Sequence, residues 1–540
     1  MEMSEDQGFN GGMTRRALMA MAAAATATAI TPVASLAQGN PVLRNNEEGP
    51  YDLVIRHGRV IDPETGLDAV RDVGIKDNRI AAISESPLQG AKVLQAEGQV
   101  VAPGFIDLHA HGQQLPAAWV QAFDGVTTAL ELESGLLPIS RYYDLTAKEG
   151  RPINYGASVA WTYARIAEKE GEEPDGTLSW FQGSFSKSNW QNSLATDEEL
   201  DNIIARVESG LQEGGLGIGI NAGYAPGCGR KEYHRLAELA ARYGVPTYTH
   251  VRYGSVKEPR SAFEAFEELV ALSAVTGAHM HVCHVNSMAA SDMAACVGLL
   301  KSAQARGLSV TVESYPYGAA STLVGAETFR GSDWTERWGV TGPSAMELNG
   351  RPLTQAEIDE LQQSAPGTVV VMHFLSPDKS ETDRALLDLA ILYPGGSIAS
   401  DAVPWLTKGG ELIEGDIWPL PEDAYAHPRS TGTYSRVLSQ YVRERKVLSL
   451  SEALGKMSLE PARVLQTSVP QMLRKGRLQV GADADIVVFD PATVQDNATF
   501  VEPARLSTGY RHVVVNGVPI IEEAKRIADA RPGRPIRRQV

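Results

Sequence analysis

The sequence predicts an α/β protein: a TIM-like (β/α)8 barrel with a small β-sandwich domain built from both ends of the chain. Two observations lead to this fold. Strand-like apolar runs alternate with amphipathic helices through the middle of the chain, which is typical of a parallel sheet. Short strands separated by turn residues occupy both ends. The number of repeated units, over roughly 370 residues, favours a closed barrel over an open sheet.

The size and charge of the chain narrow the classes of protein that it can be. It has 540 residues, of which 43% are hydrophobic and 21% charged, enough for a large core. A net charge of −17 argues against nucleic acid and anionic membranes as partners. The charge says little about a small-molecule substrate, because a local basic pocket can exist inside an acidic protein. The sequence leaves the oligomeric state open, a homo-oligomer included. Three cysteines are too few for a disulfide scaffold, and we expect buried thiols.

The N-terminus predicts an export signal over residues 1–37. Arg15 and Arg16 form a twin-arginine pattern, and an Ala-rich apolar run and a small-x-small cleavage pattern ending at Ala37 follow. The apolar run is short for a membrane span. We expect a periplasmic protein that is free of the membrane after cleavage, with residues 38–50 as a linker. The alternative is a disordered tail ahead of a true start at Met13.

The β domain is expected to combine residues 51–100 with residues 475–540. Strands are predicted at 52–56, 72–75 and 79–83 near the start, and at 484–489 and 512–517 near the end. Because both ends have the same short-strand pattern, they are expected to form one domain. Residues 101–474 between them form the predicted barrel.

The helices and strands of the barrel are predicted from stretches in which the helical and the strand pattern of apolar residues alternate. A capping box at Thr196 and Glu199 begins a helix whose apolar residues share one face, and a strand follows at 216–220. Later helices and strands alternate in the same way. The helices are predicted at 231–243, 261–276, 292–306 and 383–393, and the strands at 245–249, 279–283, 308–313, 369–372 and 397–399.

His109 and His111 follow an apolar run that begins at Val100. In an extended strand, residues i and i+2 point to the same side, so the two imidazoles can share one metal ion. Neutral imidazole is a good ligand for zinc, at about 2.0–2.1 Å. For this pair alone, two unrelated histidines remain the alternative.

Further polar side chains stand where predicted barrel strands end, which is where barrel enzymes place their chemistry. Taken singly, His250 or His284 could be a core histidine and Asp401 a helix cap. Two carboxylates, Glu131 and Glu133, end a buried strand and are costly there unless paired or metal-bound. We favour Glu133 as a ligand, with Glu131 as the alternative or as a supporting partner. Together they indicate a metal site: His109, His111, Glu133, His250, His284, Tyr315, His373 and Asp401.

These motifs resemble the metal-dependent amidohydrolase superfamily, and within it the D-aminoacylase branch. The resemblance covers nearly the whole chain after residue 50. The stretches at 62–67 and 125–133 look most like those of D-glutamate deacylases. The matching motifs are V-A-P-G-F-I-D-L-H-A-H at 101–111, D-G-V-T-T at 124–128, Y-P-Y at 315–317, S-D at 400–401, H-P-R at 427–429 and G-A-D-A-D-I at 481–486.

The sequence departs from this branch at two positions. The branch has a metal-binding cysteine where this chain has Leu132-Glu133-Ser134-Gly135, so a carboxylate from Glu133 could replace the thiolate and harden the site. The branch also has a lysine where this chain has Asn286.

The resemblance implies metal-dependent hydrolysis of N-acyl-D-amino acids, with N-acyl-D-glutamate as one substrate and one or two Zn²⁺ ions as cofactor. Asp401 would move the proton, and Tyr315 or His373 would help to polarise the scissile carbonyl. Arg429 would clamp the substrate carboxylate, although a surface ion pair is the alternative for it. Tyr224 and Ser321 would line the pocket, and Arg252 would reach a side-chain carboxylate.

Two alternatives to this function stay open. One is another amide hydrolase of the superfamily, such as a dipeptidase, a cyclic amidase or a detoxifying amidase. The other is a binding relative that keeps the fold without turnover. The sequence does not fix the acyl group, the side chain, D against L preference or the number of metal ions.

Overall fold

The computed structural model describes residues 50–539. The export signal predicted at 1–37, and all but the last residue of the predicted linker, lie outside the described residues. Among residues 50–539, no helix is both long and apolar enough to cross a bilayer. The three cysteines are free and buried, as expected.

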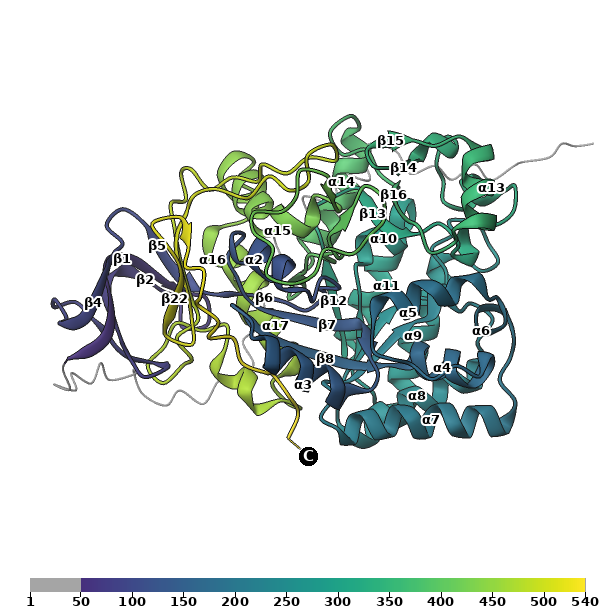
Figure 1. Cartoon of the computed structure of the whole chain (residues 1–540), viewed down its shortest axis with the longest axis horizontal. Coiled ribbons are helices and arrows are strands. Elements are labelled where there is room, and N and C mark those ends of the chain that lie inside the picture. Colours follow the sequence, from purple (N-terminus) through teal and green to yellow (C-terminus); the bar gives the residue numbers. More distant parts are fainter. Residues whose placement is uncertain (1–49, 540) are drawn as a thin grey trace, which may run out of the picture. The chain divides into compact units, whose positions relative to one another are not determined.

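Eight parallel strands form the barrel, in the order β17-β12-β11-β10-β9-β8-β7-β6. A bridge between Ala110 and Ala402 links the segments that follow β6 and β17, and so brings the two ends of this sheet together. The predicted barrel is therefore confirmed (Figure 1). Its strands are β6 (Phe105–Asp107), β7 (Val126–Leu136), β8 (Asn154–Ala160), β9 (Ile218–Asn221), β10 (Thr247–His250), β11 (Met280–Val282), β12 (Val310–Ser314) and β17 (Ser397–Ile398).

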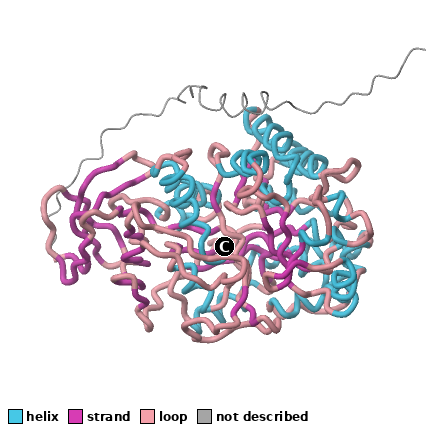
Figure 2. The backbone as a smooth tube through the Cα atoms, turned by 90° about the horizontal axis from the view of Figure 1, so that it is seen from above, coloured by secondary structure: helices cyan, strands magenta, loops and turns pink. Residues whose placement is uncertain are grey.

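Helices lie around the barrel strands (Figure 2). The predicted capping box is present, because Thr196 and Glu199 bond reciprocally at the start of α7 (Asp197–Gln212). The helices predicted at 231–243, 261–276, 292–306 and 383–393 are α8 (Arg230–Tyr243), α9 (Ala262–Thr276), α11 (Met293–Ala305) and α14 (Glu381–Ile391). The others are α2 (Leu115–Ala122), α3 (Ile139–Glu149), α4 (Trp161–Glu170), α5 (Leu178–Gly183), α6 (Asn189–Asn192), α10 (Val285–Ala289), α12 (Trp334–Arg337), α13 (Gln355–Ser364), α15 (Arg429–Arg436), α16 (Leu450–Leu454) and α17 (Glu460–Leu465).

Strands from both ends of the described chain form one nine-stranded sheet. In Figure 1 the purple N-terminal strands and the yellow C-terminal strands lie side by side. The sheet joins them through β5 and β20, and its buried side chains form a core cluster of their own. Its strands are β1 (Tyr51–Asp62), β2 (Leu67–Lys76), β3 (Arg79–Ser84), β4 (Gly90–Gln95), β5 (Val100–Pro103), β20 (Ile486–Phe489), β21 (Tyr510–Val515), β22 (Val518–Glu522) and β23 (Lys525–Arg526).

The run predicted as a barrel strand at 369–372 is not part of the barrel. It forms β16 (Val369–His373), which pairs antiparallel with β13 (Ala319–Leu323) and β14 (Met346–Leu348); β14 also pairs with β15 (Arg351–Pro352). A short hairpin, β18 (Leu406–Thr407) with β19 (Ala424–Tyr425), lies further along the chain. The barrel strand that the sequence did not reveal is β8, whose Asn-Tyr-Gly-Ala-Ser stretch has few β-branched residues.

The C-terminal segment packs against the barrel strands. Pro535 bridges to Tyr155 of β8, and the Ile536 amide donates to the Tyr155 carbonyl at 2.7 Å. The Ile536 side chain is 1% exposed and lies in one core cluster with Leu130 and Leu216. The last described residues thus pack over part of the barrel core and exclude solvent from it.

Candidate metal centre

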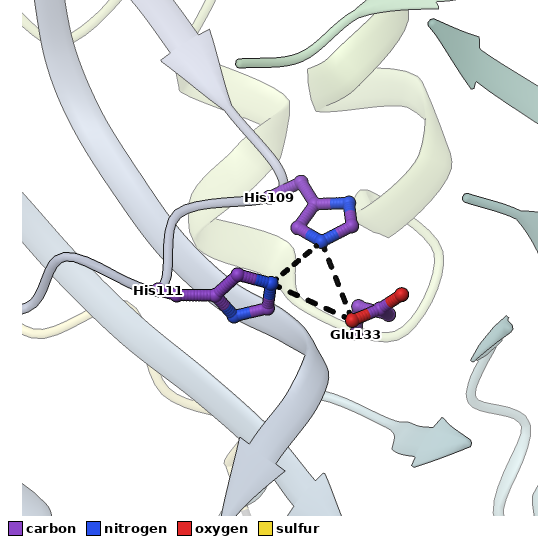
Figure 3. A group of neighbouring side chains, drawn as sticks. All are labelled: His109, His111 and Glu133. Atoms are coloured by element: carbon purple, nitrogen blue, oxygen red, sulfur yellow. Dashed lines mark hydrogen bonds and ion pairs between the residues drawn. The ribbon is translucent and has the colours of Figure 1, made fainter. Parts of the chain in front are cut away.

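His109 and His111 lie just beyond β6 and face one another through their ring nitrogens. The two Nε2 atoms are 3.0 Å apart, and each is 3.5 Å from Oε2 of Glu133 on β7 (Figure 3). His109 is fully buried and Glu133 is 3% exposed. The two histidines and the carboxylate therefore converge on one point.

The other oxygen of Glu133 faces a second pair of histidines. Oε1 is 2.9 Å from Nδ1 of His250, the last residue of β10, and 2.9 Å from Nε2 of His284, just after β11. Asn221, the last residue of β9, donates to Oε2 at 2.8 Å and fixes the carboxylate. One carboxylate thus lies between two imidazole pairs, an arrangement that can bridge two metal ions.

Carboxylates support the first histidine pair from behind. Both oxygens of Glu131 are 3.0 Å from Nδ1 of His111, and Oε1 of Glu313 on β12 is 2.5 Å from Nδ1 of His109. Such partners fix the tautomer and orientation of metal-binding histidines. The structure therefore places Glu133 between the histidines and Glu131 behind one of them.

The geometry of the first pair fits a bound cation. Nδ1 of each ring lies within hydrogen-bond distance of a carboxylate and can carry the ring proton, which leaves both Nε2 atoms to present lone pairs. Two lone pairs 3.0 Å apart repel unless a cation or a proton lies between them. Burial lowers the pKa of His111, yet Glu131 and Asp401 outweigh burial and raise that pKa to about 10. The local field thus favours positive charge, and the N/O donor set suits zinc.

Asp401 lies beside the first pair, with Oδ1 3.4 Å from Nε2 of both His109 and His111. Its φ of 51° is in the left-handed region, which non-glycine residues rarely adopt. Arg429 contacts it twice: Nη2 is 2.8 Å from Oδ2, and Nε donates to the backbone carbonyl at 2.6 Å. Burial raises the pKa of Asp401, but Arg429 and His109 reverse this and lower it, so the group is an ionised base.

A cavity of about 470 Å³ opens onto this centre, a size typical of small-molecule sites. Tyr224 and Ser321, predicted to line the pocket, both do so. The Tyr224 ring packs 5.0 Å from that of His250, and its hydroxyl lies 3.0 Å from Oγ1 of Thr322. The cavity therefore joins the metal-facing side chains to the surrounding loops.

Besides His109, which is fully buried at the centre, four predicted site residues lie outside the cavity lining among the described residues. His373 sits in the small antiparallel sheet, where Nε2 is 3.2 Å from Glu347, because its strand does not belong to the barrel. Tyr315 is 1% exposed, and its ring lies 4.6 Å from the Arg429 guanidinium. Arg252 pairs with Glu268 at 2.9 Å and donates to the Cys228 carbonyl at 2.7 Å. Arg429, the fourth, forms an ion pair with Asp401.

Sequence reasoning missed three supporting residues: Asn221, Glu313 and Ser287, whose Oγ is 3.1 Å from Nδ1 of His284. Asn221 and Glu313 stand at or next to the ends of predicted strands. The strand-end rule that selected the histidines could therefore have selected these two as well.

The fold and site have clear relatives. A model described as the Amidohydrolase family matches residues 162–521, so the chain belongs to the Amidohydrolase family. It is similar to N-acyl-D-glutamate deacylase from Alcaligenes xylosoxydans xylosoxydans, with 29% identity over 90% of this chain and 96% of the relative. It is 28% identical to D-aminoacylase from the same organism, over 89% of this chain and 96% of the relative.

A solved structure shares the fold. N-acyl-D-glutamate deacylase from Bordetella bronchiseptica, complexed with zinc and a phosphonate inhibitor that mimics the tetrahedral intermediate, superposes with a TM-score of 0.71. The identity is 24%, over 91% of this chain and 100% of that chain.

Proposed function

We propose that the protein hydrolyses the amide bond of N-acyl-D-amino acids, releasing a carboxylate and a D-amino acid. One observation carries this proposal: the Glu133 carboxylate lies between two histidine pairs, with the ionised Asp401 3.4 Å from the first pair. N-acyl-D-glutamate deacylase, D-aminoacylase and N-acyl-D-aspartate deacylase match along nearly their whole length at 26–29% identity, whereas a dihydroorotase with similar coverage is 24% identical.

We propose zinc as the cofactor; His109 and His111 would hold one ion, His250 and His284 would hold a second, and Glu133 is within reach of both pairs. The four imidazoles and the carboxylate are ligands that zinc accepts, and the solved deacylase that shares this fold is complexed with zinc. Zinc, when bound, supplies a Lewis acid that polarises the scissile carbonyl and lowers the pKa of water towards about 7.

The chain's own residues manage the proton. Asp401 accepts the proton of the attacking water at its carboxylate and later delivers it to the departing amide nitrogen. Arg429 holds Asp401 ionised and fixes its backbone. Tyr224 lines the cavity next to His250, where its ring orients the substrate.

The test is the zinc-loaded protein assayed against N-acetyl-D-amino acids and their L-enantiomers. We expect release of acetate from the D series. Asp401→Asn should lower kcat at least about 10³-fold while zinc content is unchanged. Asp359→Asn, an exposed change on α13, is the matched control and should leave activity intact. Near-normal turnover by Asp401→Asn contradicts the role of Asp401, and no turnover of any D substrate contradicts the function.

We also propose that the protein works in the periplasm, on the basis of the twin-arginine pattern at Arg15 and Arg16. Cell fractionation of the full chain should find it outside the cytoplasm. Replacing both arginines with lysine should retain it inside, and unchanged export of that variant contradicts the proposal.

A further inference from the structure

Beyond the metal-facing side chains, the largest groups on the cavity wall are aromatic and aliphatic, and they stand among polar side chains such as Gln113, Gln182 and Thr328. Tyr163 of α4 stacks on Phe181 of α5 with ring centroids 5.4 Å apart, and Phe329 stacks on Trp338 at the same separation. These four rings are between 2% and 6% exposed. Aliphatic side chains on the same wall include Leu136, Met288, Leu323, Val369, Met372 and Leu412.

The charged groups on the same wall do not favour a substrate that carries an acidic side chain in addition to its α-carboxylate. Outside the candidate centre, the charged residues among the described lining are Glu149, Arg151 and Glu414. Arg151 is already engaged: Nη1 donates to Glu149 at 2.6 Å and Nη2 donates to the Gln113 carbonyl at 2.9 Å. Its Nε also donates to Gln113, at 3.2 Å. The one guanidinium of this wall is thus paired with Glu149, and Glu414 adds a second carboxylate to the described lining.

Other cations near the centre are also occupied by the protein itself. Arg252 holds Glu268, and Arg429 holds Asp401 through Nε and Nη2. The buried Nη1 of Arg429 has no hydrogen-bond partner within residues 50–539, but Arg429 lies outside the cavity lining. Asn286 stands where the D-aminoacylase branch has a lysine; it is fully buried and bonds to the backbone of Tyr315 and Tyr317. No described cavity residue therefore offers a free cation to an acidic substrate side chain.

We infer that this cavity selects N-acyl-D-amino acids whose side chain is large and apolar, and that it rejects acidic side chains such as that of glutamate. The inference rests on the proposed function and names its substrate class. A carboxylate buried without a partner loses its hydration, whereas an aromatic or branched side chain gains contact with the rings. The α-carboxylate is common to all these substrates and does not discriminate between them.

The first test compares kcat/KM of the zinc-loaded protein across N-acetyl-D-phenylalanine, D-leucine, D-alanine, D-glutamate and D-glutamine. Glutamine has nearly the shape of glutamate without its charge, so that pair isolates the electrostatic contribution. We expect phenylalanine and leucine to exceed alanine about tenfold and glutamate about 100-fold. Glutamine should exceed glutamate at least about tenfold. Equal or faster hydrolysis of the glutamate compound overturns the inference and leaves the proposed function intact.

The second test changes the wall. Trp338→Ala should lower kcat/KM for the phenylalanine compound about tenfold more than for the alanine compound. Met288→Lys should raise the glutamate-to-glutamine ratio at least about tenfold, because it adds a cation. Leu194→Ala, an exposed apolar change outside the wall, is the control. Unchanged selectivity in both wall variants overturns the inference; no hydrolysis of any compound by the wild type overturns the proposed function with it.

Discussion

Oε1 of Glu313 lies 2.5 Å from Nδ1 of His109, although the two residues are 204 positions apart. The contact continues into the barrel core. Oε2 of Glu313 is 3.1 Å from Nε2 of His281, and Nδ1 of His281 is 2.8 Å from Oγ1 of Thr311. Neighbouring strands β11 and β12 supply these groups. The orientation of one candidate metal ligand is therefore set by a buried polar chain within the barrel.

Glu313→Gln is expected to weaken metal binding. The amide has nearly the shape of the carboxylate but no charge, so the His109 ring loses its charge-assisted partner. Zinc affinity measured by chelator competition should fall about 10–100-fold. Glu523→Gln, which changes an exposed carboxylate paired with Arg511, is the control. Unchanged zinc affinity would show that the contact does not support the centre.

The two carboxylates of β7 should behave differently. Glu133→Gln removes the shared carboxylate, so we expect zinc content to fall from two ions to at most one and kcat/KM to drop at least about 100-fold. Glu131→Gln removes only the support of His111 and should lower zinc affinity about tenfold while turnover at saturating zinc persists. Metal analysis beside steady-state kinetics separates the two variants. Reversed effects would assign the bridging role to Glu131.

Arg429 should set the acid limb of the pH profile. Asp401 must be deprotonated to accept a proton, so the rate falls as pH falls through its pKa. Arg429 lowers that pKa, and removing the cation raises it. In Arg429→Met the acid limb of kcat/KM should therefore move up by about one pH unit or more. Arg429→Lys, which keeps the charge, should move it less. An unshifted limb in the methionine variant would argue that Asp401 is not the base.

Ile536 should contribute to stability despite its position near the chain end. The side chain is 1% exposed in the barrel core cluster, so Ile536→Ala leaves a cavity. The free energy of unfolding in denaturant should fall by about 2–5 kcal/mol. Val518→Ala, at a side chain 44% exposed, should cost less than about 0.5 kcal/mol. If both variants lose the same free energy of unfolding, packing of the C-terminal segment against the barrel core does not contribute to stability.

Much of the barrel was predictable because strand and helix periodicities are local. The strand predicted at 369–372 shows the limit of that reasoning. A continuous apolar run such as Val369–Met372 indicates a buried strand, but it does not say which sheet the strand joins. His373 was therefore placed at a barrel strand end that it does not occupy. Conversely β8, which is buried throughout but poor in β-branched residues, gave little local signal.

The histidine pairs were predictable because strand ends and the alternation of side chains along a strand can be recognised from neighbouring residues alone. Roles that depend on distant partners were not. Arg252 and Arg429 carry side chains suited to a substrate carboxylate, yet each binds an acid of this chain. Glu131 and Glu133 share one strand face, so alternation alone could not separate them. Their different neighbours come from four other strands or loops that converge in three dimensions.

The bridge between Ala110 and Ala402 has a consequence for synthesis. His109 and His111 lie on one side of this seam and Asp401 on the other, so the last base of the site arrives with the strand that completes the barrel. A nascent chain cannot complete the centre before the ribosome has passed residue 402, and Arg429, which holds Asp401, is added later still. A truncated chain that ends before Asp401 therefore has the histidines but lacks the base, and it is expected to be inactive in hydrolysis.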